Sequence, residues 1–319
     1  MPTSVNAGSI ALNNGKESHP DTERRYLATR VSTPVPSPTR QVFQHPSYLR
    51  LVNALQTTLV IEQLLELFYE HIQELVQVSG VSYQNDPHQL SLLCGHDGVH
   101  RCSYRLMTAR ENLGEIVFSR AGKRFSEREL TTLETLIGTL IYPLRNAFQY
   151  RDAIQTALRD PLTGVGNRVA LDKALLREAQ MSHRYEQSLS MLMLDVDHFK
   201  NINDSFGHSC GDKVLCQIAE AIATRVRDTD QTFRYGGEEF VVLLSNTPFK
   251  DASIIAERIR RYVEQMPIVF GEQTLHASIS IGYTTLKPAE NLKSFFDRAD
   301  RALYRAKQCG RNKALAGVS

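Results

Sequence analysis

Apolar residues recur every three or four positions through residues 48–78, a spacing that predicts two amphipathic helices. Three shorter apolar runs follow, and each predicts a strand: residues 90–94, 102–106 and 113–118. The Asp97-Gly98 pair between the first two runs predicts a hairpin turn. We therefore expect a small α/β domain over residues 44–125.

A single long helix is predicted over residues 126–159. It begins with a capping box, in which Ser126 and Glu129 lie three residues apart. Pro143 inside the helix predicts a kink. The helix either covers the first domain or acts as a linker that pairs with a second copy of the chain, and we favour the pairing. The apolar residues, with Arg151 filling one gap, advance in the steps of a coiled-coil seam: Leu130, Leu133, Ile137, Leu140, Leu144, Ala147, Ile154 and Leu158.

Residues 160–319 predict a second domain with the element order β-α-β-β-α-β. The apolar run at 189–196 is typical of a buried central strand, and residues 214–226 carry one apolar helical face. Gly236-Gly237 predicts a turn between two further strands. A helix, a strand and a last helix follow near residues 252–265, 275–285 and 292–307. This order predicts a ferredoxin-like α+β domain, with an antiparallel sheet covered by helices.

Composition narrows the class of protein. Residues 1–43 are rich in Ser, Thr, Asn and Pro and predict a disordered tail. The 37 Lys and Arg residues nearly balance the 35 Asp and Glu residues, which argues against a dedicated nucleic-acid binder. Five cysteines in 319 residues do not form a disulfide framework, so we expect a cytoplasmic protein. We expect no membrane span, because no apolar run is long enough, and no secretory signal, because the first 20 residues are polar and contain no apolar h-region.

Acidic residues gather where two predicted strands meet. Asp195 and Asp197 close the central strand, and Glu238 and Glu239 lie on the neighbouring hairpin. Carboxylates at the end of a buried strand need a cation or hydrogen-bond donors. Together with the Val196 carbonyl, they predict an oxygen-rich site of the kind that binds Mg²⁺. An acidic turn in solvent is the alternative interpretation.

Five ordered motifs run through residues 160–313. They are Asp160-Pro161-Leu162-Thr163-Gly164-Val165-Gly166-Asn167-Arg168; Asp195-x-Asp197-x-Phe199-Lys200-x-x-Asn203-Asp204 with Gly211-Asp212; Arg234-Tyr235-Gly236-Gly237-Glu238-Glu239-Phe240; Ser280-Ile281-Gly282; and Asp300-Arg301-Ala302-Leu303-Tyr304-Arg305-Ala306-Lys307 with Gly310-Arg311-Asn312. This series resembles the GGDEF family, the diguanylate cyclases, in a GGEEF variant. Val165 stands where leucine is usual and His198 where an aromatic residue is common; neither replaces a required polar group.

The resemblance implies that two GTP molecules give cyclic di-GMP and two pyrophosphates, with one GTP in each of two facing domains. It implies a site for Mg²⁺ or Mn²⁺ formed by Asp195, the Val196 carbonyl, Glu238 and Glu239. Glu238, Glu239 and Lys200 would be catalytic, with either glutamate as the base. The substrate-binding residues would be Phe199, Lys200, Asn203, Asp212, Gly236, Gly237, Lys307 and Arg311. Asn203 and Asp212 would read guanine, although by residue type alone they could be a turn residue and a helix N-cap.

Regulation is also implied by the resemblance. Arg227 and Asp230 fit the family's RxxD site for inhibition by cyclic di-GMP, with Arg258 as a secondary arginine. A reaction between two loaded domains implies a homodimer. Residues 44–125 resemble a short GAF-type sensor domain for an unknown ligand, with a PAS-like domain as the alternative.

Other interpretations stay open. Cys94, His96, His100 and Cys102 could hold zinc or form a thiol switch, or could be ordinary hairpin residues. The second domain could be a silent module that binds GTP or cyclic di-GMP, or the chain could be a structural dimerisation protein. Signalling by cyclic di-GMP implies, by family resemblance, a link to biofilm formation and motility.

Overall fold

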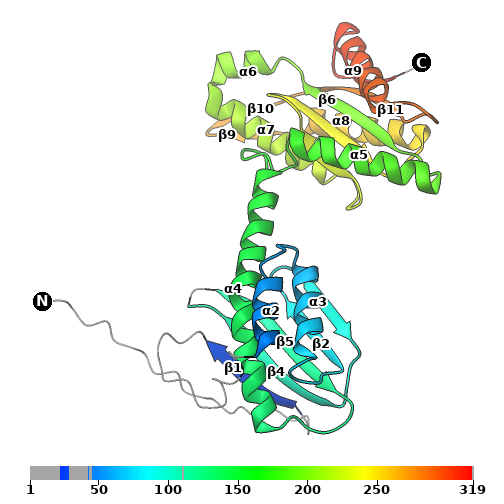
Figure 1. Ribbon diagram of the computed structural model, residues 1–319. Coiled ribbons are helices and arrows are strands. Elements are labelled where there is room, and N and C mark those ends of the chain that lie inside the picture. The colour runs from blue at the N-terminus through cyan, green and yellow to red at the C-terminus, as the bar shows by residue number, and fades with distance from the viewer. Residues whose placement is uncertain (1–21, 29–41, 43–44, 110, 318–319) are drawn as a thin grey trace, which may run out of the picture. The chain divides into compact units, whose positions relative to one another are not determined.

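The computed structural model describes residues 22–28, 42, 45–109 and 111–317. The chain divides into two compact units, Met1–Ala153 and Ile154–Ser319 (Figure 1). The first unit contains the expected sensor region and most of the long helix. The second unit contains all five motifs.

The first unit is a five-stranded sheet whose buried face packs against three helices (Figure 1). Side chains at alternate strand positions, such as Tyr83, Tyr104 and Phe118, share one core with Phe68 and Leu133 of the helices. The predicted helices and strands are therefore present. The helices are α2 (Pro46–Ala54), α3 (Ile61–Ile72) and α4 (Glu127–Ala157), and the strands, in the sheet order β1-β4-β5-β2-β3, are β1 (Thr22–Ala28), β4 (His100–Met107), β5 (Asn112–Arg120), β2 (Gly80–Asn85) and β3 (Leu90–Gly95).

The pairing of β3 and β4 differs from the sequence prediction. The prediction omitted β2, which is short and directly follows the helical stretch, and β2 pairs with both β3 and β5. The prediction of a hairpin at Asp97-Gly98 is therefore wrong, because two strands separate β3 from β4. A turn signal reports local backbone preference, whereas burial of the apolar face decides which strands pair.

β1 lies within residues 1–43, for which we expected a disordered tail. Its residues pair in parallel with β4, from Thr22 opposite Arg101 to Ala28 opposite Met107. A charged segment without apolar alternation carries no strand signal of its own, so this pairing could not be predicted locally. Apart from Val42, the rest of the expected tail lies outside the described residues.

α4 begins as predicted, but most of its apolar stripe packs inside the first unit. The N–H and hydroxyl of Ser126 both donate to the Glu129 carboxylate at 2.8 Å, which forms the capping box. The helix continues through Pro143 without a break. The seam residues from Leu130 to Ala147 all belong to the core of the first unit. The interpretation that the helix covers the first unit therefore holds for this part, and the apolar spacing there no longer supports pairing between copies.

The second unit has the predicted order of strands and helices. β6 lies between β11 and β8, with β7 beyond β8, and all of these pairs are antiparallel, as in a ferredoxin-like sheet. β12 adds in parallel to β11, and β9 and β10 form a separate hairpin. The strands are β6 (Ser190–Val196), β7 (Gln231–Arg234), β8 (Glu239–Leu244), β9 (Ile268–Phe270), β10 (Gln273–Leu275), β11 (Ile279–Thr285) and β12 (Ala314–Ala316), and the helices are α5 (Arg168–Tyr185), α6 (Phe199–Phe206), α7 (His208–Ala223), α8 (Phe249–Gln265) and α9 (Leu292–Gln308).

Helices cover both faces of this sheet, and β6 is buried along its whole length. Leu192 and Leu194 pack in the core that contains α7 and α8, whereas Met191 and Met193 pack in the core that contains α5 and α9. Gly282 of β11 lets α9 approach closely, because a Cβ there would collide with the α9 backbone. Polar chemistry on β6 is thereby confined to the strand's end.

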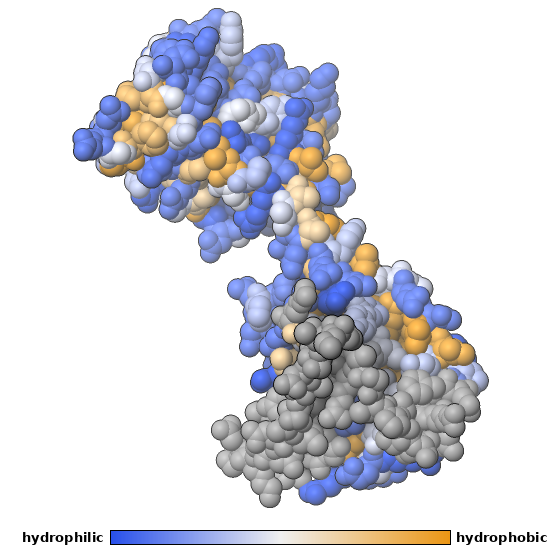
Figure 2. Space-filling model, turned by 90° about the vertical axis from the view of Figure 1, so that its left-hand side faces the viewer, coloured by the Kyte–Doolittle hydropathy of each residue, from blue (hydrophilic) through white to orange (hydrophobic). Residues whose placement is uncertain are grey.

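Hydrophilic residues predominate on the face of the second unit seen in Figure 2, with small groups of hydrophobic residues among them. No helix formed by the described residues is long and apolar enough to cross a membrane.

The start of α4 carries a buried ion pair. The Arg120 guanidinium donates to the two Glu129 oxygens at 2.9 and 3.1 Å. These bonds, helped by the capping box and opposed by burial, lower the pKa of Glu129 from 4.5 to about 2. A carboxyl group with a lower pKa in the folded state stabilises the fold above its unfolded pKa. That contribution is lost as the pH falls through the folded pKa.

We expect Glu129→Gln to lower the free energy of unfolding of the first unit by about 2 kcal/mol at pH 7. The deficit relative to the wild type should shrink between pH 4.5 and 2, where the wild-type carboxyl becomes protonated. Urea unfolding of the intact chain, followed by circular dichroism, measures both effects. Glu111→Gln in an exposed loop is the control, and a deficit independent of pH would contradict the role of this charge.

Candidate functional site

The end of β6, the turn between β7 and β8, and the last turn of α9 meet at one place in the second unit. Asp195 lies opposite Glu239 in the β6–β8 register, and the Val196 N–H donates to the Glu238 carbonyl at 3.2 Å. Lys307 reaches in from α9, and its Nζ lies 2.7 Å from Asp195 Oδ2. Residues that are 112 positions apart (307 − 195) therefore form one charged cluster.

The carboxylates of this cluster are close enough to influence one another. Burial raises the pKa of Asp195, and the hydrogen bond and charge of Lys307 oppose that rise, as does the charge of Arg311. Burial also raises the pKa of Glu238, and the negative charges of Asp195 and Glu239 add to it. The cluster therefore has more negative charge than its own lysine compensates, which favours a bound cation.

The donor set fits a hard divalent cation, although it is not a preformed cage. Asp195, Glu238, Glu239 and the Val196 carbonyl offer only oxygen atoms, which Mg²⁺ and Mn²⁺ prefer. Among the described residues, no three His, Cys, Asp or Glu side chains are already gathered around one point as metal ligands. Mg²⁺ commonly takes its remaining ligands from substrate phosphates and water, so an incomplete protein shell suits it.

The Gly236-Gly237 turn is fixed by an arginine whose role the sequence did not reveal. Arg234 donates to the Gly237 carbonyl at 2.7 and 3.1 Å, and its Nη1 lies 3.1 Å from Asp160 Oδ1. A Cβ on Gly236 would meet the Glu239 carboxylate, so a larger residue there would displace that side chain. Arg234 thereby joins the first motif to the third, and an arginine directly before a Gly-Gly turn is the signal that could have indicated it.

Asn203 and Asp212 lie inside helices. Asn203 is in α6 and Asp212 is the fifth residue of α7, so the alternatives of a turn residue and a helix N-cap are both wrong. Asn203 Oδ1 is buried without a hydrogen-bond partner and packs against Gly211, where a Cβ would collide with it. An unpartnered buried acceptor is costly, and a hydrogen-bond donor from a ligand would remove that cost.

The remaining predicted substrate residues lie on different elements of the second unit. Phe199 is buried at the start of α6, whereas Lys200 beside it is exposed. Arg311 is exposed in the loop that follows α9. The charge of Arg311 acts on Asp195, so the structure offers an exposed cation near the carboxylate cluster, which suits a phosphorylated ligand.

Arg227 and Asp230 lie in the turn between α7 and β7. Asp230 is buried, and its Oδ2 accepts the Arg227 N–H at 2.9 Å while its Oδ1 has no partner. Burial raises the pKa of Asp230, and interactions with Arg227 and the charge of Arg258 oppose the rise. Asp230 is therefore not part of a solvated helix end.

Arg258 of α8 lines an open cavity of about 710 Å³ on the second unit, together with Arg225, Arg261 and Tyr262. The Arg225 guanidinium stacks over the Tyr262 ring, with 3.8 Å between its Cζ and the ring centroid. Arg258 donates to the Arg225 carbonyl. Arg225 and Tyr262 were not predicted as site residues from the sequence, because no short motif contains them.

The cysteines and histidines of residues 94–102 do not converge. Cys94 is on β3 and Cys102 on β4, with β2 and β5 between these strands. Burial, followed by the charges of Glu66 and Glu70, raises the pKa of Cys94, which disfavours a reactive thiolate. The idea of a zinc site or thiol switch formed by these residues therefore finds no support in the described part of the chain.

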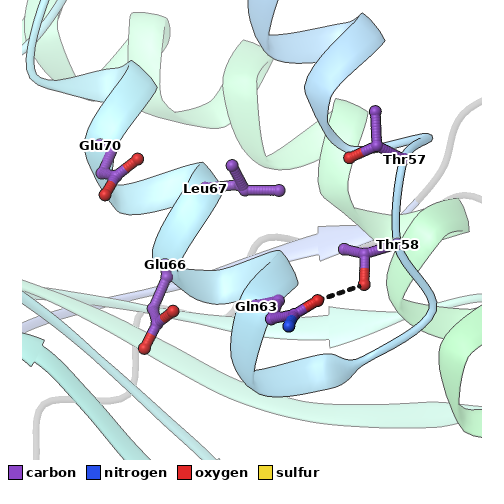
Figure 3. A pocket seen from close by; sticks show the side chains of 6 residues that line it. All are labelled: Thr57, Thr58, Gln63, Glu66, Leu67 and Glu70. Atoms are coloured by element: carbon purple, nitrogen blue, oxygen red, sulfur yellow. Dashed lines mark hydrogen bonds between the residues drawn. The ribbon is translucent and has the colours of Figure 1, made fainter.

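A cavity of about 300 Å³ opens beside α3 in the first unit (Figure 3). Glu66 and Glu70 extend from successive turns of the helix, and Thr58 donates to Gln63 across the entrance to α3 at 2.8 Å. Apart from Leu67, the lining is polar or acidic, unlike the apolar pockets that enclose most organic ligands.

Comparison with known proteins supports the resemblance found in the motifs. The family described as "Diguanylate cyclase, GGDEF domain" matches residues 157–313. DgcS, a diguanylate cyclase of Shewanella oneidensis, is 30% identical over 247 residues, which cover 74% of this chain and 77% of that protein. DgcP, a diguanylate cyclase of Pseudomonas aeruginosa, is 45% identical over 162 residues, which cover 51% of this chain and 24% of that protein. The chain thus spans about a quarter of the length of DgcP.

A solved structure shows the same fold. The coiled coil and GGDEF domain of DgcB from Caulobacter crescentus, in complex with c-di-GMP, matches with a TM-score of 0.54 and 28% sequence identity. The match covers 58% of this chain and 99% of that chain.

We expect Arg234 and Asp160 to be energetically coupled, because both side chains are mostly buried and share hydrogen bonds. In a double-mutant cycle with Arg234→Gln and Asp160→Asn, the double variant should lose about 1 kcal/mol less stability than the sum of the single variants. Urea unfolding of the intact chain measures this. Arg50 and Glu74, an exposed pair in the first unit, provide the control cycle, in which the coupling should be much smaller. If the stability losses of the Arg234 and Asp160 variants were strictly additive, the ion pair between them would contribute nothing to stability.

Proposed function

The chain belongs to the GGDEF family of diguanylate cyclases, and from that premise we propose that it condenses two GTP molecules into cyclic di-GMP and two pyrophosphates. The observation that carries the proposal is the meeting of Asp195, Glu238 and Lys307 at the end of one buried strand. A carboxylate cluster that lacks positive charge, beside a lysine, is suited to metal-assisted phosphoryl chemistry.

Asp195, the Val196 carbonyl, Glu238 and Glu239 would hold Mg²⁺ or Mn²⁺. The bound cation would neutralise phosphate charge and lower the pKa of the attacking ribose hydroxyl. Glu238 and Glu239 are both placed to accept the hydroxyl proton, and we favour Glu238. Lys200 would stabilise charge on the phosphates, and the bare backbone of Gly236 and Gly237 leaves room for them.

Base recognition would come from two helices. The unpartnered Asn203 Oδ1 on α6 can accept a hydrogen bond from guanine, and the exposed Asp212 carboxylate on α7 can accept from the guanine N1 and N2 hydrogens. Adenine lacks this donor pattern, so the pair selects GTP over ATP. Phe199 anchors the start of α6, and Lys307 and Arg311 would bind the triphosphate.

The reaction would require a homodimer, because each GTP supplies the hydroxyl that attacks the other. Since the core of the first unit covers most of the α4 seam, we assign pairing to the surface of the second unit and to the end of α4, where Tyr150 and Ile154 are exposed. The first unit, GAF-like in our interpretation, would respond to a ligand and alter how the two catalytic units face each other.

We expect the intact chain to form cyclic di-GMP from GTP and Mg²⁺, and Glu239→Ala to lower the rate by at least about 100-fold. Nucleotide separation by chromatography measures the product. Glu272→Ala, at an exposed acid in the β9–β10 turn, should retain the wild-type rate. Equal product from the wild type and Glu239→Ala would contradict the proposed site, and GTP binding without turnover in the wild type would identify a silent binding module.

Product inhibition is the regulatory part of the proposal. Arg227, Asp230 and Arg258 would hold cyclic di-GMP, since the unpartnered Asp230 Oδ1 can accept a guanine hydrogen and an arginine can donate to guanine O6 and N7 or to phosphate. The complex of DgcB with c-di-GMP shows that a relative binds this product.

We expect Asp230→Ala to raise the cyclic di-GMP concentration needed for half-inhibition by about 10-fold or more, with little change in the initial rate. Asp228→Ala alters an exposed neighbour and should leave inhibition unchanged. Initial rates across a series of added cyclic di-GMP concentrations test this. If Asp230→Ala were inhibited as strongly as the wild type, Asp230 would not belong to the inhibitory site.

A further inference from the structure

Asp197 is a buried carboxylate to which neither the proposed metal site nor the guanine site assigns a role. Only 5% of its surface is exposed. Ser280 Oγ donates to its Oδ1 at 2.6 Å, and Ser278 Oγ donates to its Oδ2 at 2.7 Å. The third donor is the backbone N–H of Asn312, 3.0 Å from Oδ2. Two oxygens with three donors from distant parts of the chain form a specific anchor, because a buried carboxylate requires such compensation.

The segment that this anchor holds is strained. Arg311 and Asn312 have φ angles of 57° and 45°, and Gly310 before them has a φ of 98°. Residues other than glycine rarely adopt this left-handed conformation, although asparagine does so more readily than arginine. Two consecutive residues of this kind persist only where the surroundings hold them.

Other contacts secure the two ends of the segment. The Arg311 N–H donates to the Ala306 carbonyl at 3.1 Å, and the Lys313 carbonyl accepts the Ile281 N–H at 2.8 Å. The Asn312 side chain joins Arg260 and Glu264 of α8, each at 2.6 Å. Asp197 supplies the contact to the backbone N–H at the centre, one residue from Arg311.

The position of the Arg311 backbone depends on this geometry, because Arg311 directly precedes Asn312. Arg311 is exposed, and its charge acts on Asp195 at the end of the neighbouring strand. Lys307 is positioned differently, because it belongs to the last turn of α9, a helix that packs in the sheet's core through Ala299 and Leu303. Loss of the anchor should therefore redirect Arg311 and leave Lys307 in place.

We propose that Asp197 is a positioning residue for the triphosphate of GTP: it holds the left-handed Arg311-Asn312 segment through the Asn312 N–H, so that the Arg311 guanidinium faces the end of β6. This inference rests on the proposed function, because it takes GTP as the ligand. Asp197 itself touches neither substrate nor metal in this account.

The test measures the affinity of the intact chain for a non-hydrolysable GTP analogue in the presence of Mg²⁺, by calorimetry. We expect Arg311→Ala to weaken binding by about 10-fold, the typical effect of one charge-assisted contact. Asp197→Asn should weaken binding to a similar degree. The double variant should bind no more weakly than either single variant, because both changes remove the same contact.

Thermal unfolding separates positioning from general stabilisation. Losses of stability from Asp197→Asn and Arg311→Ala should add, whereas their effects on affinity should not. Glu290→Gln is the matched control, because Glu290 is also a nearly buried acid, paired with Arg298 before the opposite end of α9. It should lower stability and leave the affinity unchanged.

The outcomes are distinct. Wild-type affinity in Asp197→Asn, or additive losses of affinity with Arg311→Ala, would overturn the proposal. Where Asp197→Asn does not fold, the milder Ser280→Ala decides in the same way, with a weakening of about 2-fold to 3-fold expected and wild-type affinity overturning the proposal. Failure of the wild type to bind the analogue at all would instead refute the proposed function.

Discussion

The second unit depends on one electrostatic constraint: a strand that is buried on both faces ends in two carboxylates. β6 contributes only apolar or small side chains until Asp195, so negative charge appears only where the strand leaves the core. Each aspartate then has its own form of compensation. Lys307 balances the charge of Asp195, and neutral donors surround Asp197. This difference separates a residue available for chemistry from a residue that holds structure.

The Asp195–Lys307 pair also explains why the site favours a ligand that brings both a cation and phosphates. Lys307 is the nearest positive charge to a group of three acids, and by itself it does not neutralise them. When a divalent cation binds together with a triphosphate, the cation interacts with the acids and the phosphates interact with the lysine. Binding of the pair therefore compensates the acids and the lysine locally, whereas either ion alone would compensate only one of them.

The sequence predicted the second unit better than the first. Through their resemblance to the GGDEF family, the five spaced motifs indicated Asp195, Glu238, Asn203 and Lys307 as site residues. The spacing could not distinguish Asp195 from Asp197, since their roles depend on Ser278, Ser280 and Asn312, which lie more than 80 positions further along the chain. Arg234 remained without a role for the same reason, because its partner Asp160 lies 74 positions away.

In the first unit, the sequence predicted elements but not their partners. Three of the five strands were recognisable from their apolar runs, whereas β1 and β2 were missed. The order β1-β4-β5-β2-β3 depends on which apolar faces are covered, and this is not a local property. α4 shows the same limit, because an apolar stripe in steps of three and four serves equally well in a monomer core and in a helix pair.

Different contacts hold the two ends of α4. His88 of the β2–β3 turn stacks on Phe148 of α4 with 4.5 Å between the ring centroids, so packing of the first unit extends to the last buried part of the helix. The same helix ends at Ala157, whose carbonyl accepts a hydrogen bond from Asn167 at 2.7 Å. Asn167 belongs to the motif that contains Asp160, the partner of Arg234 at the Gly-Gly turn. The end of α4 is thereby hydrogen-bonded to the motif that, through Asp160 and Arg234, holds the turn that carries Glu238.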